Sequence, residues 1–170
     1  ALVKDLPEND GLVQCSEDVC QISLLERHRA TGQVTNGFVS GFGYQGTMAI
    51  ASTVAHDSHH LIVVGTDKTM MATATNRLEE VGGGVTVWKD GVEIALIRLP
   101  IAGLMSDSPA REVAEDAQKM LDAMIECGCA LNNAFMQHSL LALVVIPELR
   151  ISDLGIVDVT KFELTNLFED

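Results

Sequence analysis

The chain is organised around the stretch STVAHDSHHLIVVG, residues 52–65. Its two ends belong to apolar runs at residues 48–55 and 61–64, which are short, partly β-branched and bounded by turn signals. This pattern predicts two buried strands. Three of the five histidines of the chain fall between them, within residues 56–60. We therefore expect a cluster of imidazoles at the rim of a sheet, where rigid backbone can hold side chains in place.

Four further segments predict strands. They are residues 19–27, 85–89, 92–99 and 156–159. The second and third are separated by Asp90-Gly91, a pair typical of a two-residue hairpin turn. The glycine-rich stretch 38–46 predicts either a ligand-facing loop or a bulged strand.

Two segments have the apolar spacing of helices. The first, 67–81, has Thr66 or Asp67 as its expected N-cap and Gly82 after its last turn. The second, 109–126, has Ser108 as its expected N-cap.

Together these elements predict an α+β fold in which a mixed or antiparallel sheet packs with two or three helices. Residues 48–81 and 85–126 each follow the order strand, strand, helix, which suggests pseudo-duplicated ββα units. Residues 131–149 are ambiguous between a helix from Ala134 to about Leu143 and a buried strand. We expect one domain over residues 1–170.

Composition excludes several classes of protein. An apolar fraction of 47% and a mean hydropathy of +0.22 exclude a disordered chain. No apolar run approaches the roughly 18–20 residues of a membrane span. With 24 acidic against 11 basic residues the net charge is −13, which disfavours nucleic acid and anionic membranes as partners.

The cysteines and the N-terminus indicate the setting of the chain. Cys15, Cys20, Cys127 and Cys129 lack the spacing of a zinc ribbon or a redox pair, and we expect free thiols in a reducing cytoplasm. The first residues, ALVKDLPENDG, contain neither an initiator methionine nor a secretory signal. This beginning suggests a fragment of a longer protein.

The candidate site residues are His56, Asp57, Ser58 and His59. A metal site of their own is disfavoured because H-x-E and H-E-x-x-H are absent, and because only a tight turn at Asp57-Ser58 would bring His56 and His59 together. Ser58 lacks the G-x-S-x-G context of a nucleophile. A substrate-side or proton-relay role, completed by other residues, and structural hydrogen bonding at the sheet rim both remain open.

Secondary candidates are Arg27, His28, Ser106 and Asp107. Arg27 follows Glu26 directly, which favours an ion pair over a substrate clamp. Ser106 and Asp107 precede a helix, where capping is the simpler interpretation. His138 lies in an apolar segment and is expected to be a hydrogen-bonded core histidine rather than a ligand.

Six blocks of the sequence, in order, resemble the C-terminal domain of bacterial and archaeal adenine deaminases. They are ERHRATG (26–32), GFVSGFG (37–43), AIASTVAHDSHHLIVVGT (49–66), NRLEEVGGG (76–84), LPIAGLMSD (99–107) and VIPELRISDLGIVDV (145–159). The resemblance covers about residues 20–160, and AHDSH and PIAGLMSD are its most specific parts. Two departures are His60, where asparagine is usual, and MQHSLLALVV (136–145), which lacks a usual proline.

The resemblance implies a hydrolase acting on the C–N bond of a cyclic amidine, converting adenine to hypoxanthine and ammonia in purine salvage. It also implies an amidohydrolase barrel with a pair of divalent metals, manganese or iron, that activates water. This chain has no H-x-H motif and is too short for a barrel of about 250 residues, so we expect the metals to bind elsewhere and the isolated chain to be inactive.

Two roles for the chain follow from the resemblance. In the first, residues 56–59 cover or shape the mouth of the barrel and lie near the adenine. The barrel of the same enzyme is then the partner of this chain. In the second, the chain is a non-catalytic module whose helices at 67–81 and 109–126 form the interface of a homo-oligomer.

Overall fold

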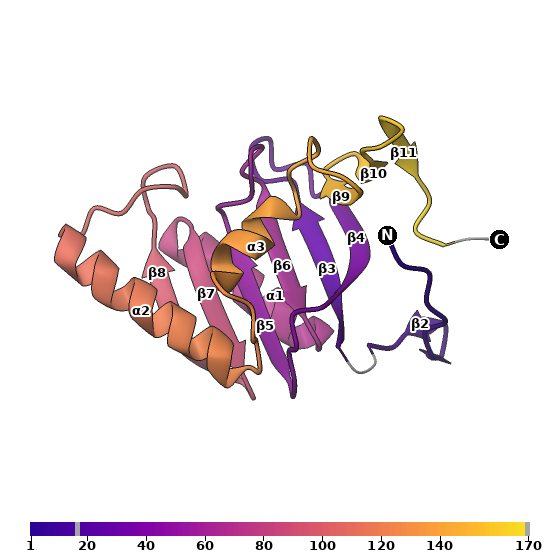
Figure 1. Ribbon diagram of the computed structural model, residues 1–170. Helices are drawn as coiled ribbons and strands as arrows, with labels where there is room; N and C mark the ends of the chain where they lie inside the picture. Colours follow the sequence, from indigo (N-terminus) through magenta and orange to yellow (C-terminus); the bar gives the residue numbers. More distant parts are fainter. Residues whose placement is uncertain (16–17, 169–170) are drawn as a thin grey trace.

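The computed structural model describes residues 1–15 and 18–168 and has a six-stranded antiparallel sheet at its centre (Figure 1). The strands, in the order in which they pair, are β4 (Val34–Ser40), β3 (Val19–Leu25), β6 (Leu61–Gly65), β5 (Met48–Ser52), β7 (Gly84–Lys89) and β8 (Val92–Arg98). The strands predicted at 19–27, 48–55, 61–64, 85–89 and 92–99 are confirmed, with ends shifted by up to three residues. The hairpin turn at Asp90-Gly91 is also confirmed, with positive φ at both residues.

Side chains of the sheet alternate between two apolar cores. In β5, Met48 and Ile50 belong to one core, whereas Ala49 and Ala51 belong to the other. Helix α1 (Lys68–Val81) packs on the alanine side, and α2 (Ala110–Glu126) on the opposite side together with the short α3 (Ala134–Leu140). Figure 1 shows α1 behind the sheet and the other two helices in front of it. The predicted α+β fold is therefore confirmed as three layers.

The two ββα units have the same element order but not the same packing. The first consists of β5, β6 and α1, and the second of β7, β8 and α2. Their helices cover opposite faces of one sheet, because α1 shares a core with Ala49 and α2 shares a core with Met48. The similarity of order thus does not extend to a common three-dimensional unit.

The helix ends agree with the prediction for α1 and differ for α2. Asp67 caps α1 by accepting a hydrogen bond of 2.8 Å from the Met70 N–H, and Gly82 ends the helix in the left-handed conformation. Ser108 is not the N-cap of α2: Pro109 occupies that position and makes no side-chain capping bond. Pro109 has φ −56° and ψ 141°, so the helix begins one residue later than expected.

Two smaller sheets complete the described part of the chain. β1 (Glu8–Asn9) pairs with β2 (Leu12–Val13), while β9 (Leu149–Ser152), β10 (Gly155–Asp158) and β11 (Glu163–Thr165) form a meander. The meander joins the α3 side of the main core through Ile151 and Ile156. The strand predicted at 156–159 corresponds to β10, and α3 resolves residues 131–149 in favour of a helix that ends three residues earlier than predicted.

Within residues 1–15 and 18–168, each helix is too short or too polar to cross a lipid bilayer.

Candidate functional site

Most of the candidate residues lie at the end of the sheet toward which the arrow of β3 points in Figure 1. At this end of the sheet β3 finishes and β6 begins, since Leu25 pairs with Leu61. β5 finishes beside the start of β6, since Ser52 pairs with Ile62. We call residues 56–60, in the connection from β5 to β6, the histidine rim. Loops 26–33 and 99–105 lie at the same end of the sheet, after β3 and β8.

A tight turn brings His56 and His59 to the same side of the histidine rim. Residues 56–58 form the turn, and the His59 N–H donates a hydrogen bond of 2.7 Å to the carbonyl of Ala55. The two imidazole rings meet edge to face, with centroids 5.4 Å apart. The His56 N–H donates to the carbonyl of Ser139 at 3.0 Å, which fixes the start of the turn to α3. The structure therefore has the arrangement that the sequence allowed only with a turn at Asp57-Ser58.

The four candidate residues of the histidine rim differ in exposure. Asp57 and Ser58 are exposed at its tip, whereas His56 and His59 are half-buried. The buried Nδ1 of His59 has no hydrogen-bond partner among the described residues. Burial, followed by the nearby His56 and Arg27, lowers the pKa of His59 despite the carboxylate of Asp57. His59 is therefore mainly neutral at pH 7, and a neutral imidazole can accept a proton or a hydrogen bond.

Arg27 and His28 hold the backbone of the histidine rim. Arg27 donates from Nε to the carbonyl of His59 at 2.6 Å and from Nη2 to the carbonyl of Ala102 at 2.9 Å. His28 Nε2 donates to the carbonyl of Ser58 at 2.7 Å. Loop 26–33 thus supports the rim from the neighbouring strand end.

The predicted ion pair between Glu26 and Arg27 is wrong for the described residues. The Glu26 carboxylate instead accepts hydrogen bonds from the backbone N–H groups of His28, Arg29 and Thr31 and from the Thr31 hydroxyl. Burial alone would raise the pKa of Glu26, but these bonds outweigh it and lower the pKa to about 2. Glu26 therefore shapes loop 26–33 and leaves Arg27 free to contact the rim.

His60 has a supporting position that the sequence analysis did not assign to it. Its side chain is only 8% exposed, with Nδ1 3.9 Å from Glu26 Oε1 and Nε2 3.7 Å from Asp153 Oδ2. Its ring centroid lies 4.7 Å from that of His28. Burial lowers the pKa of His60 more than Asp153 raises it. The only available signal was its place at the end of the histidine cluster, because Asp153 is distant in the sequence.

Ser106 and Asp107 are not brought into contact with the histidine rim. Ser106 Oγ accepts a hydrogen bond of 3.2 Å from the Ser108 N–H, and Asp107 is exposed. Neither side chain is hydrogen-bonded to the rim within the described ranges. Ser106 therefore stabilises the local turn before α2.

His138 is confirmed as a hydrogen-bonded core histidine. Its Nε2 forms a hydrogen bond of 2.7 Å with the Tyr44 hydroxyl in the core beneath α3, and Phe42 contacts its ring edge to face. Complete burial lowers the pKa of His138 to about 3.

The described cysteines are free thiols, in agreement with the prediction.

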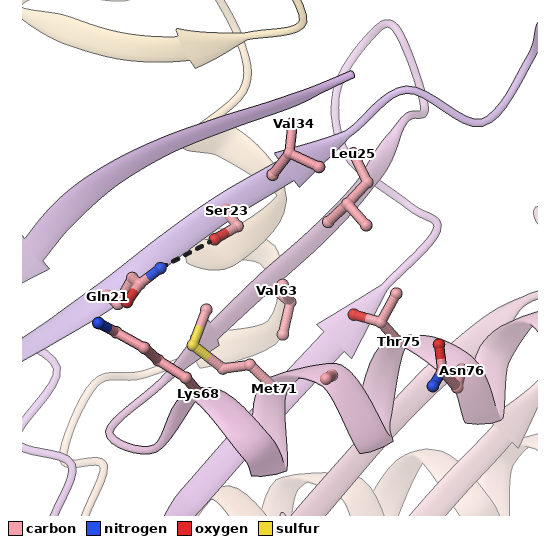
Figure 2. Close-up of a pocket in the computed structure, with 10 residues that line it drawn as sticks. Gln21, Ser23, Leu25, Val34, Val63, Lys68, Met71, Thr75 and Asn76 are labelled. Atoms are coloured by element: carbon pink, nitrogen blue, oxygen red, sulfur yellow. Dashed lines mark hydrogen bonds between the residues drawn. The ribbon is translucent and has the colours of Figure 1, made fainter. Parts of the chain in front are cut away.

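A hollow of about 240 Å³ lies away from the rim, between α1 and the exposed part of β3 and β4 (Figure 2). Its lining is Gln21, Ser23, Leu25, Val34, Val63, Lys68, Met71, Ala72, Thr75 and Asn76. None of these residues belongs to the histidine rim.

Among the described residues, no group of three or more histidine, cysteine, aspartate or glutamate side chains is arranged to hold a metal ion. The residues present thus do not fit the ligand set of a metal pair.

Comparison with known proteins identifies the family of the chain. Residues 1–163 match the family model of the adenine deaminase C-terminal domain. Among similar proteins, the adenine deaminase of Ruegeria pomeroyi is 71% identical over 99% of this chain, adenine deaminase 3 of Rhizobium meliloti 64% over 98%, and the adenine deaminase of Clostridium botulinum 46% over 96%. The chain spans 28% of the length of each. This chain belongs to the adenine deaminase C-terminal domain family.

Proposed function

We propose that the chain is the C-terminal part of an enzyme that hydrolyses adenine to hypoxanthine and ammonia in purine salvage. We further propose that the histidine rim covers the mouth of the active site formed by the rest of that enzyme. Family membership supports the first statement, because the similar proteins carry the name adenine deaminase and extend well beyond this chain. The arrangement of His56 and His59 on one side of a braced turn carries the second.

The reaction needs two things that a residue at the mouth can supply. Water adds to the purine carbon that bears the amino group, and the amine must gain a proton before it leaves as ammonia. A neutral imidazole such as His59 can accept a proton at a ring nitrogen and return it, and a closed mouth excludes bulk water. The divalent metal pair, manganese or iron, would bind on the barrel, and its part is to activate the attacking water.

The proposal is tested in the full-length enzyme by two measurements. We expect the enzyme to convert adenine to hypoxanthine with release of ammonia and to leave cytosine unchanged. We also expect saturating hypoxanthine to slow carbethoxylation of His56 and His59 by at least about fivefold, as measured by peptide mass spectrometry, because a bound purine would cover both rings.

The two measurements separate the two statements. Failure to deaminate adenine would overturn the proposed activity. Deamination without purine protection of His56 and His59 would place the rim away from the substrate. Cytosine, added at the same concentration, is the matched control for non-specific slowing of the reagent.

A second candidate function is that of an assembly module, which one observation favours. Helix α2 exposes Leu121 and Ile125, the latter at 65%, whereas α1 contributes no large exposed apolar side chain among the described residues. Exposed apolar side chains at i and i+4 on one helix are typical of an interface. If the enzyme is a homo-oligomer through this chain, α2 rather than α1 provides the contact.

We expect Ile125→Glu to dissociate such an oligomer of the full-length enzyme, because the change places a charge in an apolar interface. The measurement is molar mass by light scattering over a range of protein concentrations. Thr73→Glu, which adds the same charge on the exposed side of α1, is the control and should leave the mass unchanged. An unchanged mass for Ile125→Glu would remove α2 as an oligomer contact.

A further inference from the structure

We propose that Arg27 is a positioning residue that locks the histidine rim and loop 99–105 into one rigid unit and thereby orients His59. Its guanidinium donates to the carbonyl of His59 at 2.6 Å and to the carbonyl of Ala102 at 2.9 Å. These two acceptors lie in different loops, which are connected to different strands of the sheet. The consequence for catalysis rests on the proposed function, whereas the locking of the loops does not.

Loop 99–105 is shaped to receive the guanidinium. Ile101 and Met105 exchange backbone hydrogen bonds of 3.1 Å, which closes the loop on itself. A Cβ at Gly103 would lie 2.9–3.1 Å from the Nη2, Nη1 and Cζ atoms of Arg27. Gly103 also has a φ of +74°, which disfavours any other residue. The flat face of the guanidinium therefore packs directly on the backbone of this loop.

The far side of loop 99–105 is fixed to the sheet. Thr53, which follows β5, donates from Oγ1 to the carbonyl of Gly103 at 2.6 Å and accepts from the N–H of Gly84 at 2.8 Å. Loop 99–105 is thus fixed to β7 on one side and to Arg27 on the other. Because Arg27 also holds His59, its loss would remove one support from the histidine rim and one from loop 99–105, and would disconnect the two segments.

Arg27 affects His59 through charge as well as through geometry. His59 faces His56, Arg27, His28 and the carboxylate of Asp57, and the positive charge of Arg27 is among the influences that lower its pKa. Lysine at position 27 would keep this charge, but its single ammonium lacks the planar fork that reaches two carbonyls. Glutamine would remove the charge as well. The two substitutions therefore separate orientation from electrostatics.

The test compares Arg27→Lys and Arg27→Gln in the full-length enzyme. We expect amide hydrogen exchange in residues 56–60 and 101–105 to become about tenfold faster in both variants, because neither lysine nor glutamine can bridge the two loops as the guanidinium does. We expect kcat to fall about threefold to tenfold in both. Only Arg27→Gln should move the acidic limb of the kcat/KM profile to higher pH, because only it removes the positive charge beside His59.

Two further variants complete the design. Gly103→Ala should accelerate exchange in the same two loops, because the added methyl group displaces the guanidinium. Arg29→Gln removes a neighbouring exposed charge and should change neither exchange nor kcat. If both Arg27 variants left exchange unchanged in residues 56–60, or in residues 101–105, the proposal would be overturned. If exchange became faster but the enzyme kept its activity without the His59 side chain, Arg27 would still be shown to join the two loops, and the proposed role of the rim in catalysis would be overturned.

Discussion

Replacing His59 with alanine in the full-length enzyme is expected to lower kcat/KM for adenine by well over tenfold, in the range that removal of a general acid or base produces. His59 is half-buried, its Nδ1 has no partner among the described residues, and its pKa is lowered. The lowered pKa keeps the imidazole neutral at pH 7, the form that can accept a proton and return it. Activity should accordingly fall on the acidic side, as pH drops through the pKa of His59 and the ring becomes charged.

The fold should tolerate the His59→Ala substitution, because the backbone of His59 rather than its side chain makes the supporting hydrogen bonds. A thermal unfolding curve close to that of the wild type would show this. His59→Gln is the matched variant, since it keeps hydrogen-bonding groups but cannot relay a proton. Activity restored by glutamine would indicate hydrogen bonding to the purine, and full activity in both variants would make His59 structural.

Acid is expected to destabilise the chain through His138. Because burial lowers the pKa of this histidine to about 3 in the folded state, the unfolded state binds its proton first as pH falls below about 6.5. The stabilisation is complete above pH 6.5 and is lost as pH falls toward 3, at about 1.4 kcal/mol for each pH unit. The total is on the order of 5 kcal/mol, a large part of the stability of a typical domain.

Urea unfolding at several values of pH between 4 and 7.5 would measure this loss. The double variant Tyr44→Phe/His138→Leu removes both partners of the buried hydrogen bond and should flatten the pH dependence. The single variant Tyr44→Phe keeps the imidazole and should retain the slope at a lower stability. A double variant whose slope equals that of the wild type would show that other groups cause the acid sensitivity.

Most of the regular structure could be predicted because it depends on local patterns. The hairpin at Asp90-Gly91 and the ends of α1 at Asp67 and Gly82 are set by residues that favour one backbone conformation. The N-cap of α2 was mispredicted because Ser108 and Pro109 are both good starting residues, and the chain enters this helix directly from proline. The opposite faces covered by α1 and α2 could not be read from two identical element orders.

The candidate site was predictable in composition but not in geometry. The clustering of His56, Asp57, Ser58 and His59 between two strands was visible, and the turn that joins two of the imidazoles was one of the alternatives. The roles of Arg27 and His60 were not visible. Glu26 beside Arg27 suggested an ion pair, but after β3 ends at Leu25 the Glu26 carboxylate turns to the backbone of its own loop and Arg27 to the carbonyls of two other loops.

The amino-acid sequence by itself determined five strands of the central sheet, helices α1 and α2, and the position of the histidines between two buried runs, because each depends on residues close together in the chain. Only the tertiary structure decided which groups surround those histidines. Arg27 meets His59 across 32 positions and Ala102 across 75, and Asp153 approaches His60 from the distant meander. Such contacts depend on the order in which strands pair, and that order minimises the free energy of the whole core rather than of any local segment.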